Sequence, residues 1–301
     1  MRPVDKLLVA YITFTTLVLI VRWNLSSPET WLLLAMHALV GTLLYLFTRL
    51  EPGNRVGYVL HTIYPLLLLS TFYTELGVLS LQRDLSETFA RDTVVQGWEA
   101  AIFGGQITYE WIRQAPSVFW SGILHLAYMA YYPIILAGPA LLLMRGETTK
   151  AQNVVFTTML AFVICYVVFA LYPVAGPNYT FEHPTGPVRE VWSARLVYSL
   201  LGTGSAIGTA FPSSHVAATV AVNFSLWREW RGLALVILVP TILLVVGTVY
   251  CQMHYGVDAL AGLCVGLGAG WIGMLVARRQ EDQPVQPLAP NLSQSKNHGH
   301  R

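Results

Sequence analysis

Eight apolar runs, each near the length of a membrane span, dominate the sequence and limit what it can fold into. A helix needs about 20 apolar residues to cross a bilayer, where only helices and closed barrels satisfy every backbone polar group. The runs therefore predict an all-α, polytopic transmembrane helix bundle of about eight spans. They cover residues 7–22, 31–48, 56–80, 117–144, 152–173, 212–228, 232–251 and 256–277.

The composition agrees with this fold class. Hydrophobic residues make up 54% of the chain and charged residues 11%, whereas soluble domains carry roughly 25% charged residues. The formal net charge of only +2 gives no indication of the concentrated basic face that nucleic acid requires, so no nucleic acid is expected as a partner. The three cysteines lie in apolar runs and are expected to be free core residues: Cys165, Cys251 and Cys264.

Three stretches differ from the apolar runs. Residues 81–116 and 174–211 mix charges with aromatic, Pro and Gly residues, which favours interfacial helices in the loops. Residues 280–301 are polar and Pro-rich, which predicts a disordered cytoplasmic tail after a single transmembrane domain at 1–279. The first run is interpreted as a signal anchor, because no A-x-A-like cleavage site follows it.

The distribution of Lys and Arg predicts the orientation. In an eight-span arrangement, 12 of the 18 basic residues fall on the side that holds both termini. Because cytoplasmic loops are enriched in Lys and Arg, both termini are predicted to be cytoplasmic. We expect a multi-pass protein of the plasma membrane whose two long irregular segments face the outer side.

Residues with catalytic potential occur in two short strings. AFPSSHVAAT places His215 at the start of one apolar run, and YCQMHYGVDALAG places His254 and Asp258 at the start of the last. Between the two histidines there is room for one span to cross the membrane and a second to return. Both histidines are therefore predicted to lie at the same depth on the outer side. The alternative for each histidine alone is a satisfied core residue.

Two local features favour chemistry on a phosphate. Asp258 follows His254 by four residues, so on a helix the carboxylate would share its face and hold one ring nitrogen protonated. That leaves the other nitrogen as a nucleophile or base. Ser213 or Ser214 can cap the next helix, whose free N–H groups and positive dipole end suit an anion beside His215.

On these residues the chain resembles the type 2 phosphatidic acid phosphatase superfamily of membrane-embedded lipid phosphatases and haloperoxidase relatives. FPSSHVA is similar to its Pro-Ser-Gly-His motif, with Ser214 in the Gly place, and HYGVD matches its His-x-x-x-Asp motif. The sequence looks closest to the branch containing inositol phosphorylceramide synthase, through DTVVQGWEAAIFGGQITYEW and YPVAGPN. The resemblance covers roughly residues 84–277.

The resemblance implies a two-step mechanism without metal or cofactor. His254 would attack phosphorus to give a phosphohistidine, and Asp258 would orient that histidine and stabilise its charge. His215 would be general acid and then general base, while Ser213 and Ser214 would hold the phosphoryl oxygens. Water as acceptor makes the enzyme a lipid phosphate phosphatase, which we place slightly ahead. An alcohol acceptor makes it a lipid phosphotransferase of the inositolphosphotransferase type.

The sequence departs from this branch where two arginines are usual. Asn178 follows the GP pair, and Gln252 stands two residues before the nucleophilic histidine; both amides can donate hydrogen bonds to a phosphate but carry no charge. The Lys-x6-Arg-Pro motif of other members is also missing. Three readings stay open: the substrate carries less charge, activity has decayed, or the outer loop supplies the charge through Arg189, Arg195 or His183.

The remaining polar residues are given structural interpretations. His37, His61 and His125 have no acidic or histidine neighbour at helical spacing, so core packing or helix pairing is expected. Glu75 could face the site or lie at the membrane interface, and the interface is preferred. An aromatic belt is expected for Tyr128, Tyr131 and Tyr132. The predicted partners are a lipid phosphate substrate and membrane lipids. The competing class is a transporter or structural membrane protein that uses the polar triad only to bind ions or to tie helices together.

Overall fold

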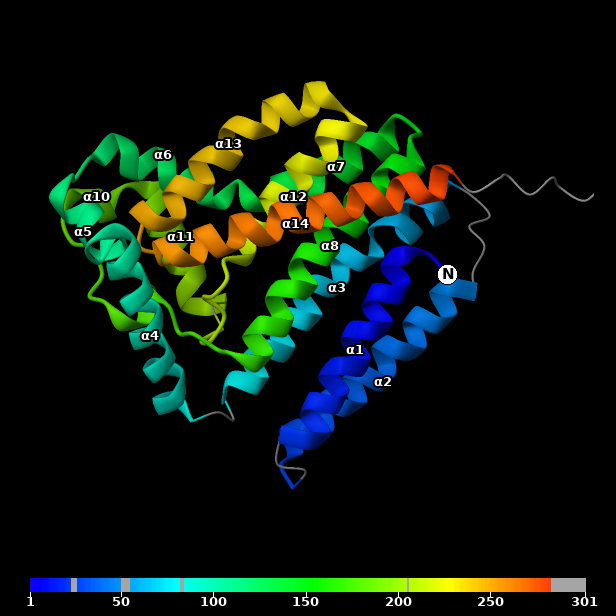
Figure 1. The fold of residues 1–301 in the computed structure, drawn as a ribbon, viewed down its shortest axis with the longest axis horizontal. Coiled ribbons are helices and arrows are strands. Elements are labelled where there is room, and N and C mark those ends of the chain that lie inside the picture. The colour runs from blue at the N-terminus through cyan, green and yellow to red at the C-terminus, as the bar shows by residue number, and fades with distance from the viewer. Residues whose placement is uncertain (23–25, 50–54, 82–83, 205, 283–301) are drawn as a thin grey trace, which may run out of the picture.

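The computed structural model describes residues 1–22, 26–49, 55–81, 84–204 and 206–282, which form fourteen helices and one isolated β-bridge (Figure 1). Of the tail predicted to be disordered, residues 283–301 lie outside the described residues, and Gln280 and Glu281 still belong to the last helix. In chain order the helices are α1 (Pro3–Arg22), α2 (Pro28–Arg49), α3 (Arg55–Leu81), α4 (Leu85–Phe103), α5 (Ile107–Gln114), α6 (Val118–Met129), α7 (Tyr131–Met144), α8 (Thr148–Leu171), α9 (Pro177–Thr180), α10 (Pro187–Glu190), α11 (Trp192–Gly204), α12 (Ser214–Glu229), α13 (Arg231–Tyr250) and α14 (Gly256–Glu281).

The predicted all-α polytopic bundle is confirmed, and the number of spans is refined. Among the described residues, α1, α2, α3, α8, α13 and α14 are long and apolar enough to cross a membrane. The predicted run 117–144 is broken at Ala130 into α6 and α7, which bend by 45° and make a seventh span if counted as one. The run 212–228 forms α12, whose 16 residues are short for a complete span.

Helix α12 is the centre of the bundle. It packs mainly against α14, α8 and α13, and most of its side chains are buried. Glycines of α14 allow the closest approach: a Cβ on Gly262 would lie 2.6 Å from the Ser213 carbonyl oxygen, and one on Gly266 would lie 2.7 Å from the Ala217 carbonyl oxygen. The glycine-rich segment thus lets α14 run directly against α12, as the small-residue spacing indicates.

Helix α4 buries two acidic residues and exposes several large apolar ones. Its exposed residues include Leu85, Phe89 and Trp98, whereas Asp92 and Glu99 are almost completely buried. Acidic residues two turns apart lie on one face of a helix, and here that face is turned toward the loop before α9 and the start of α14. In Figure 1, α4, α5, α6, α10 and α11 gather at the end of the molecule opposite the N-terminus.

The N-terminal helices hold a polar contact that helical spacing does not reveal. Nε2 of His37 on α2 lies 3.0 Å from Oε1 of Glu75 on α3, and both side chains are buried. Nδ1 of His37 lies 2.8 Å from the Thr16 hydroxyl on α1. The expected interfacial position of Glu75 is therefore wrong, because tertiary packing brings a histidine from another helix against it.

Candidate active site

His254 and Asp258 lie together where α14 begins. His254 is in the turn between α13 and α14, and Asp258 is in the first turn of α14. Nδ1 of His254 lies 3.5 Å from Oδ2 of Asp258, and the same oxygen accepts the Tyr255 N–H at 2.8 Å. The pair therefore does not share one helix, as the spacing argument assumes. Instead the carboxylate reaches back past the start of the helix, as a capping residue does.

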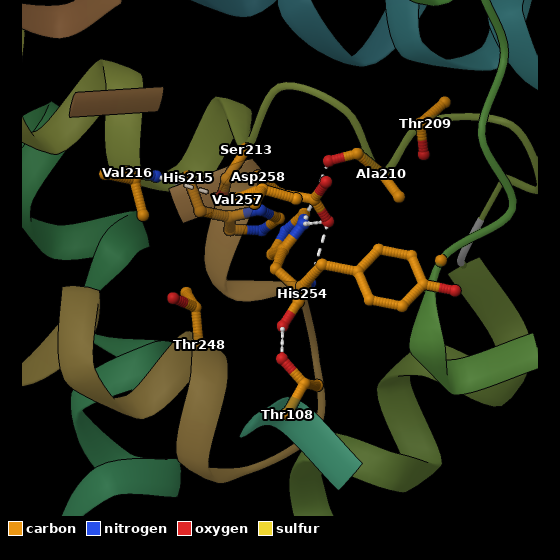
Figure 2. Close-up of polar contacts among 12 residues, drawn as sticks. Thr108, Thr209, Ala210, Ser213, His215, Val216, Thr248, His254, Val257 and Asp258 are labelled. Atoms are coloured by element: carbon orange, nitrogen blue, oxygen red, sulfur yellow. Dashed lines mark hydrogen bonds and ion pairs between the residues drawn. The ribbon is translucent and has the colours of Figure 1, made fainter. Parts of the chain in front are cut away.

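A backbone carbonyl holds the ring of His254 more closely than the carboxylate does. The Ala210 oxygen lies 3.0 Å from Nδ1 of His254, and Figure 2 shows this carbonyl and the Asp258 carboxylate on the same side of the ring. Since a carbonyl oxygen can only accept, Nδ1 carries the proton and Nε2 keeps a free lone pair. Ala210 is itself held by donating its N–H to the Val174 oxygen at 3.0 Å. No sequence spacing indicates this contact.

His215 lies beside His254, at the same end of the bundle. The ring centroids of the two histidines are 5.7 Å apart, and the rings are tilted by 56°. Tyr128 stacks on the His215 ring at 4.8 Å, and Tyr131 contacts it at 4.4 Å. The predicted meeting of the two histidine strings is thus present in the structure. Tyr128, expected in an aromatic belt, is buried in the site instead.

The Pro-Ser-Ser segment forms the N-terminus of α12. Ser213 is the N-cap residue, and its hydroxyl accepts the Val216 N–H at 3.4 Å. The Ser213 N–H donates to the Asp258 carbonyl at 3.0 Å, so it is already engaged. The first-turn N–H groups without a helical acceptor therefore belong to Ser214 and His215, and these are available to an anion beside the two histidines.

Gln252 is held by the outer loop. It has a positive φ of 58°, and its side-chain N–H₂ group lies 3.0 Å from the Glu182 oxygen and 3.4 Å from the Pro177 oxygen. Its side-chain oxygen accepts from Nη1 of Arg113 at 2.8 Å. In this geometry the amide hydrogens point to the loop. The Gln252 amide can donate to a phosphate only if its hydrogen bonds to the loop break. Asn178, in α9, has a buried side-chain oxygen without a hydrogen-bond partner among the described residues.

Basic side chains lie close to the segment that precedes His254. Arg113 also donates to the Glu182 carbonyl, and Arg189 lies over the Tyr198 ring at 4.5 Å. His183 contacts the same ring at 5.4 Å. Burial, with the charges of Arg189 and Arg113, lowers the pKa of His183, which keeps this histidine neutral at pH 7.

The spacing of the sequence does not single out Arg113 for this cluster. It lies in α5, far along the chain from Gln252, and only the fold brings the two together. Of the three basic residues named from the sequence, Arg189 and His183 lie around Tyr198, whose hydroxyl donates to the Cys251 oxygen at 3.4 Å. Arg195 makes no such contact within the described part of the chain.

Two buried acids of α4 connect the segments of the site. Asp92 accepts the N–H groups of Ala175 and Gly176 at 2.7 and 2.8 Å, and the Tyr255 hydroxyl at 2.9 Å. It thereby ties the loop before α9 to the residue that follows His254. Neither the apolar runs nor the histidine motifs point to this carboxylate, because its partners are mostly backbone groups from distant segments.

Glu99, two turns after Asp92 on α4, makes a similar connection. Its carboxylate accepts the N–H of Val257 at 3.2 Å, and both the N–H and the hydroxyl of Thr108 at 3.1 and 2.9 Å. The Thr108 hydroxyl also lies 3.0 Å from the His254 carbonyl oxygen, as Figure 2 shows. The backbone on both sides of the catalytic turn is therefore anchored to α4.

Comparison with known proteins agrees with this arrangement. The sequence model of the PAP2 superfamily matches residues 99–272, which is more than half of the chain and contains both histidines and Asp258. The chain belongs to the PAP2 superfamily. No curated protein and no solved structure matches it significantly.

Membership of the PAP2 superfamily suggests an activity of the phosphatase or phosphotransferase type. The match begins at residue 99, near the end of α4, so the buried Glu99 lies inside the matched region and Asp92 lies before it. The branch of inositol phosphorylceramide synthase receives no separate support.

Proposed function

We propose that this protein is a membrane-embedded lipid phosphate phosphatase that works through a phosphohistidine on His254. The observation that carries the proposal is the state of that ring: Nδ1 is held by the Ala210 carbonyl and Asp258, so Nε2 is a free nucleophile next to His215. An anion-binding helix terminus lies at the same place. A polar triad that only ties helices together has no need of a free imidazole lone pair.

The residues divide the proposed reaction between them. Nε2 of His254 attacks phosphorus, and Asp258 balances the positive charge of the phosphohistidine. His215 protonates the leaving lipid oxygen and then accepts a proton from the attacking water. The free N–H groups of Ser214 and His215 stabilise the phosphoryl oxygens as negative charge develops on them.

A lipid substrate is supported by the surroundings of the site. The site lies beside helices whose outer surfaces are apolar, including Trp98 and Ile102 on α4 and Phe119 and Trp120 on α6. Aromatic residues of this kind favour the membrane–water interface, which is the level of a lipid headgroup. Arg113 and Arg189 supply positive charge near the turn that contains His254, whereas the side chains of Asn178 and Gln252 are uncharged.

The test is the release of inorganic phosphate by purified protein in detergent with EDTA, from lipid mono-, di- and pyrophosphates. Wild type is expected to release phosphate from at least one class, and His254→Asn to lose the activity. His61→Asn, which removes a remote histidine of α3, is the matched control and should retain it. Rapid quenching with labelled substrate should trap an acid-labile, alkali-stable phosphoenzyme in wild type only.

The same experiment separates the phosphatase from the phosphotransferase. Labelled phosphate that appears on an added alcohol or polyol, with little free phosphate, identifies an alcohol as the acceptor. Absence of both products from every lipid, in folded wild-type protein, rejects the proposed function.

A further inference from the structure

The break between α6 and α7 faces His215. Tyr128 lies in the last turn of α6, and Tyr131 is the first residue of α7, so the 45° bend presents both rings to the histidine. Tyr128 stacks nearly parallel to the imidazole, with an interplanar angle of 29°. The stack and the second ring together restrict how the imidazole can turn.

Tyr128 also contacts His215 through its hydroxyl. The hydroxyl oxygen lies 3.3 Å from Nε2 of His215, and no other hydrogen-bond partner of this hydroxyl is found among the described residues. Because a hydroxyl oxygen can accept, it can take the N–H of Nε2 in the imidazolium and also in the neutral ring. The neutral ring then keeps its proton on Nε2 and leaves Nδ1 bare.

The other nitrogen is left without a partner inside the protein. Nδ1 of His215 is buried and has no hydrogen-bond partner among the described residues. Buried polar atoms are usually satisfied, and an exception in a native site needs a reason. A substrate oxygen bound beside the N-terminus of α12 would provide the missing partner.

We propose that Tyr128 is a positioning residue that reserves Nε2 of His215, so that Nδ1 is the atom that exchanges a proton with the substrate. This inference rests on the proposed function and names which nitrogen performs the acid and base steps. A hydroxyl suits the task because its oxygen accepts from the protonated Nε2 whether the ring is neutral or charged. Tyr128 therefore holds Nε2 in every protonation state of the ring.

Every proton that moves in the two steps has a donor and an acceptor. In the first, the P–O bond to the leaving oxygen breaks as the bond to Nε2 of His254 forms, and the Nδ1 proton of the His215 imidazolium passes to that oxygen. His215 then keeps its Nε2 proton, which it donates to Tyr128. In the second step, the acceptor hydroxyl gives its proton to Nδ1 while its oxygen displaces His254 from phosphorus, and the imidazolium is restored.

The first test reads the tautomer directly and needs no substrate. Nitrogen NMR of protein labelled at histidine, with His215→Asn to assign the signals, should show Nε2 protonated and hydrogen-bonded, and Nδ1 bare, in the neutral state. Tyr128→Phe keeps the ring stack but removes the hydroxyl, so this preference should be lost. Nδ1 protonated in the neutral ring of wild type, or an unchanged spectrum in the variant, overturns the proposal.

The second test is kinetic. Tyr128→Phe should lower kcat by about 10- to 100-fold with little change in KM, since general acid–base catalysis contributes about 100-fold or more and the hydroxyl does not bind substrate. Tyr132→Phe removes a hydroxyl from the same aromatic group, away from His215, and should behave as wild type.

The outcomes separate the two proposals. A Tyr128→Phe enzyme with wild-type kcat, alongside an inactive His254→Asn enzyme, rejects the role of Tyr128 and leaves the phosphatase intact. An inactive wild type rejects the phosphatase, while the NMR result still decides whether Tyr128 sets the tautomer.

Discussion

His254 owes its reactive form to two acceptors that lie on one side of its ring. The Ala210 carbonyl is the nearer, at 3.0 Å, and Asp258 supplies the negative charge at 3.5 Å. The carbonyl alone is enough to fix the tautomer, because it cannot donate. The carboxylate therefore contributes most once the ring becomes positive on phosphorylation.

Asp258→Asn separates these two contributions. The side-chain oxygen of asparagine can still accept the Tyr255 N–H, so the start of α14 should be retained. The positive charge of the phosphohistidine is then unbalanced, and we expect kcat to fall by at least about 100-fold. Phosphate release measures the effect, and a thermal melt in detergent checks the fold. Activity near that of wild type in a folded variant would show that the carboxylate is only a cap.

At the scale of helices, close packing between α14 and α12 sets the position of the site. The glycines of α14 bring its backbone against Ser213 and Ala217, and Ser213 in turn donates its N–H to the Asp258 carbonyl. The cap of one helix and the first turn of the next are thereby joined. The two acids of α4 hold the same junction from the other side.

Gly266→Ala tests the close contact between α14 and α12. The added Cβ would lie 2.7 Å from the Ala217 oxygen, and backbone atoms cannot easily give way, so we expect a loss of about 1–3 kcal/mol in the free energy of unfolding. Gly268→Ala is the control on the same helix, because nothing lies within 4 Å of its added Cβ. Thermal melts of both proteins compare them. Equal stability would mean that the glycines are not needed for packing.

The contact between His37 on α2 and Glu75 on α3 predicts that the stability effects of substituting the two residues will not be additive. Removing one partner, in His37→Leu or Glu75→Leu, leaves the other polar group buried and should cost about 3–5 kcal/mol. The double variant should cost clearly less than the sum of the two, because neither group is then stranded. Unfolding in detergent measures the three proteins. Strict additivity would show that the two side chains do not interact.

At the scale of the whole molecule, the orientation in the membrane sets which leaflet the site can reach. Excess Lys and Arg beside the termini predicts that the site faces the outer side. Thr149, at the start of α8, and Thr185, in the loop before α10, should then lie on opposite sides. Both side chains are exposed, so each position can report its own side.

Labelling with a membrane-impermeant maleimide tests this orientation. In a Cys264→Ser background, which leaves only the buried Cys165 and Cys251, intact cells should be labelled through Thr185→Cys and not through Thr149→Cys. After lysis both should react. The reverse pattern in intact cells would place the site on the cytoplasmic side and move the expected substrate to the inner leaflet.

Much of this architecture could be predicted from local sequence. Eight apolar runs indicate a helical membrane bundle because each run carries its own signal, the length needed to cross a bilayer. The cysteines are free, as their apolar surroundings predict, but only Cys165 and Cys251 are buried; the core position expected for Cys264 is wrong, because its side chain is exposed. His215 and His254 could be placed at one end because two consecutive helices return the chain to the side where it began. Each of these inferences depends on neighbours in sequence.

Other features were decided only by tertiary structure, since their partners are distant in sequence or are backbone groups with no residue signature. The Ala210 carbonyl fixes the tautomer of His254, and Arg113, which lies on a separate helix, donates to the Gln252 side chain. The His37–Glu75 contact joins two helices. Periodicity reports which face of a helix is apolar, but it does not report which distant atom that face meets. The sequence therefore determined the helices and the chemistry available at their ends, and packing decided which nitrogen of each histidine is free to react.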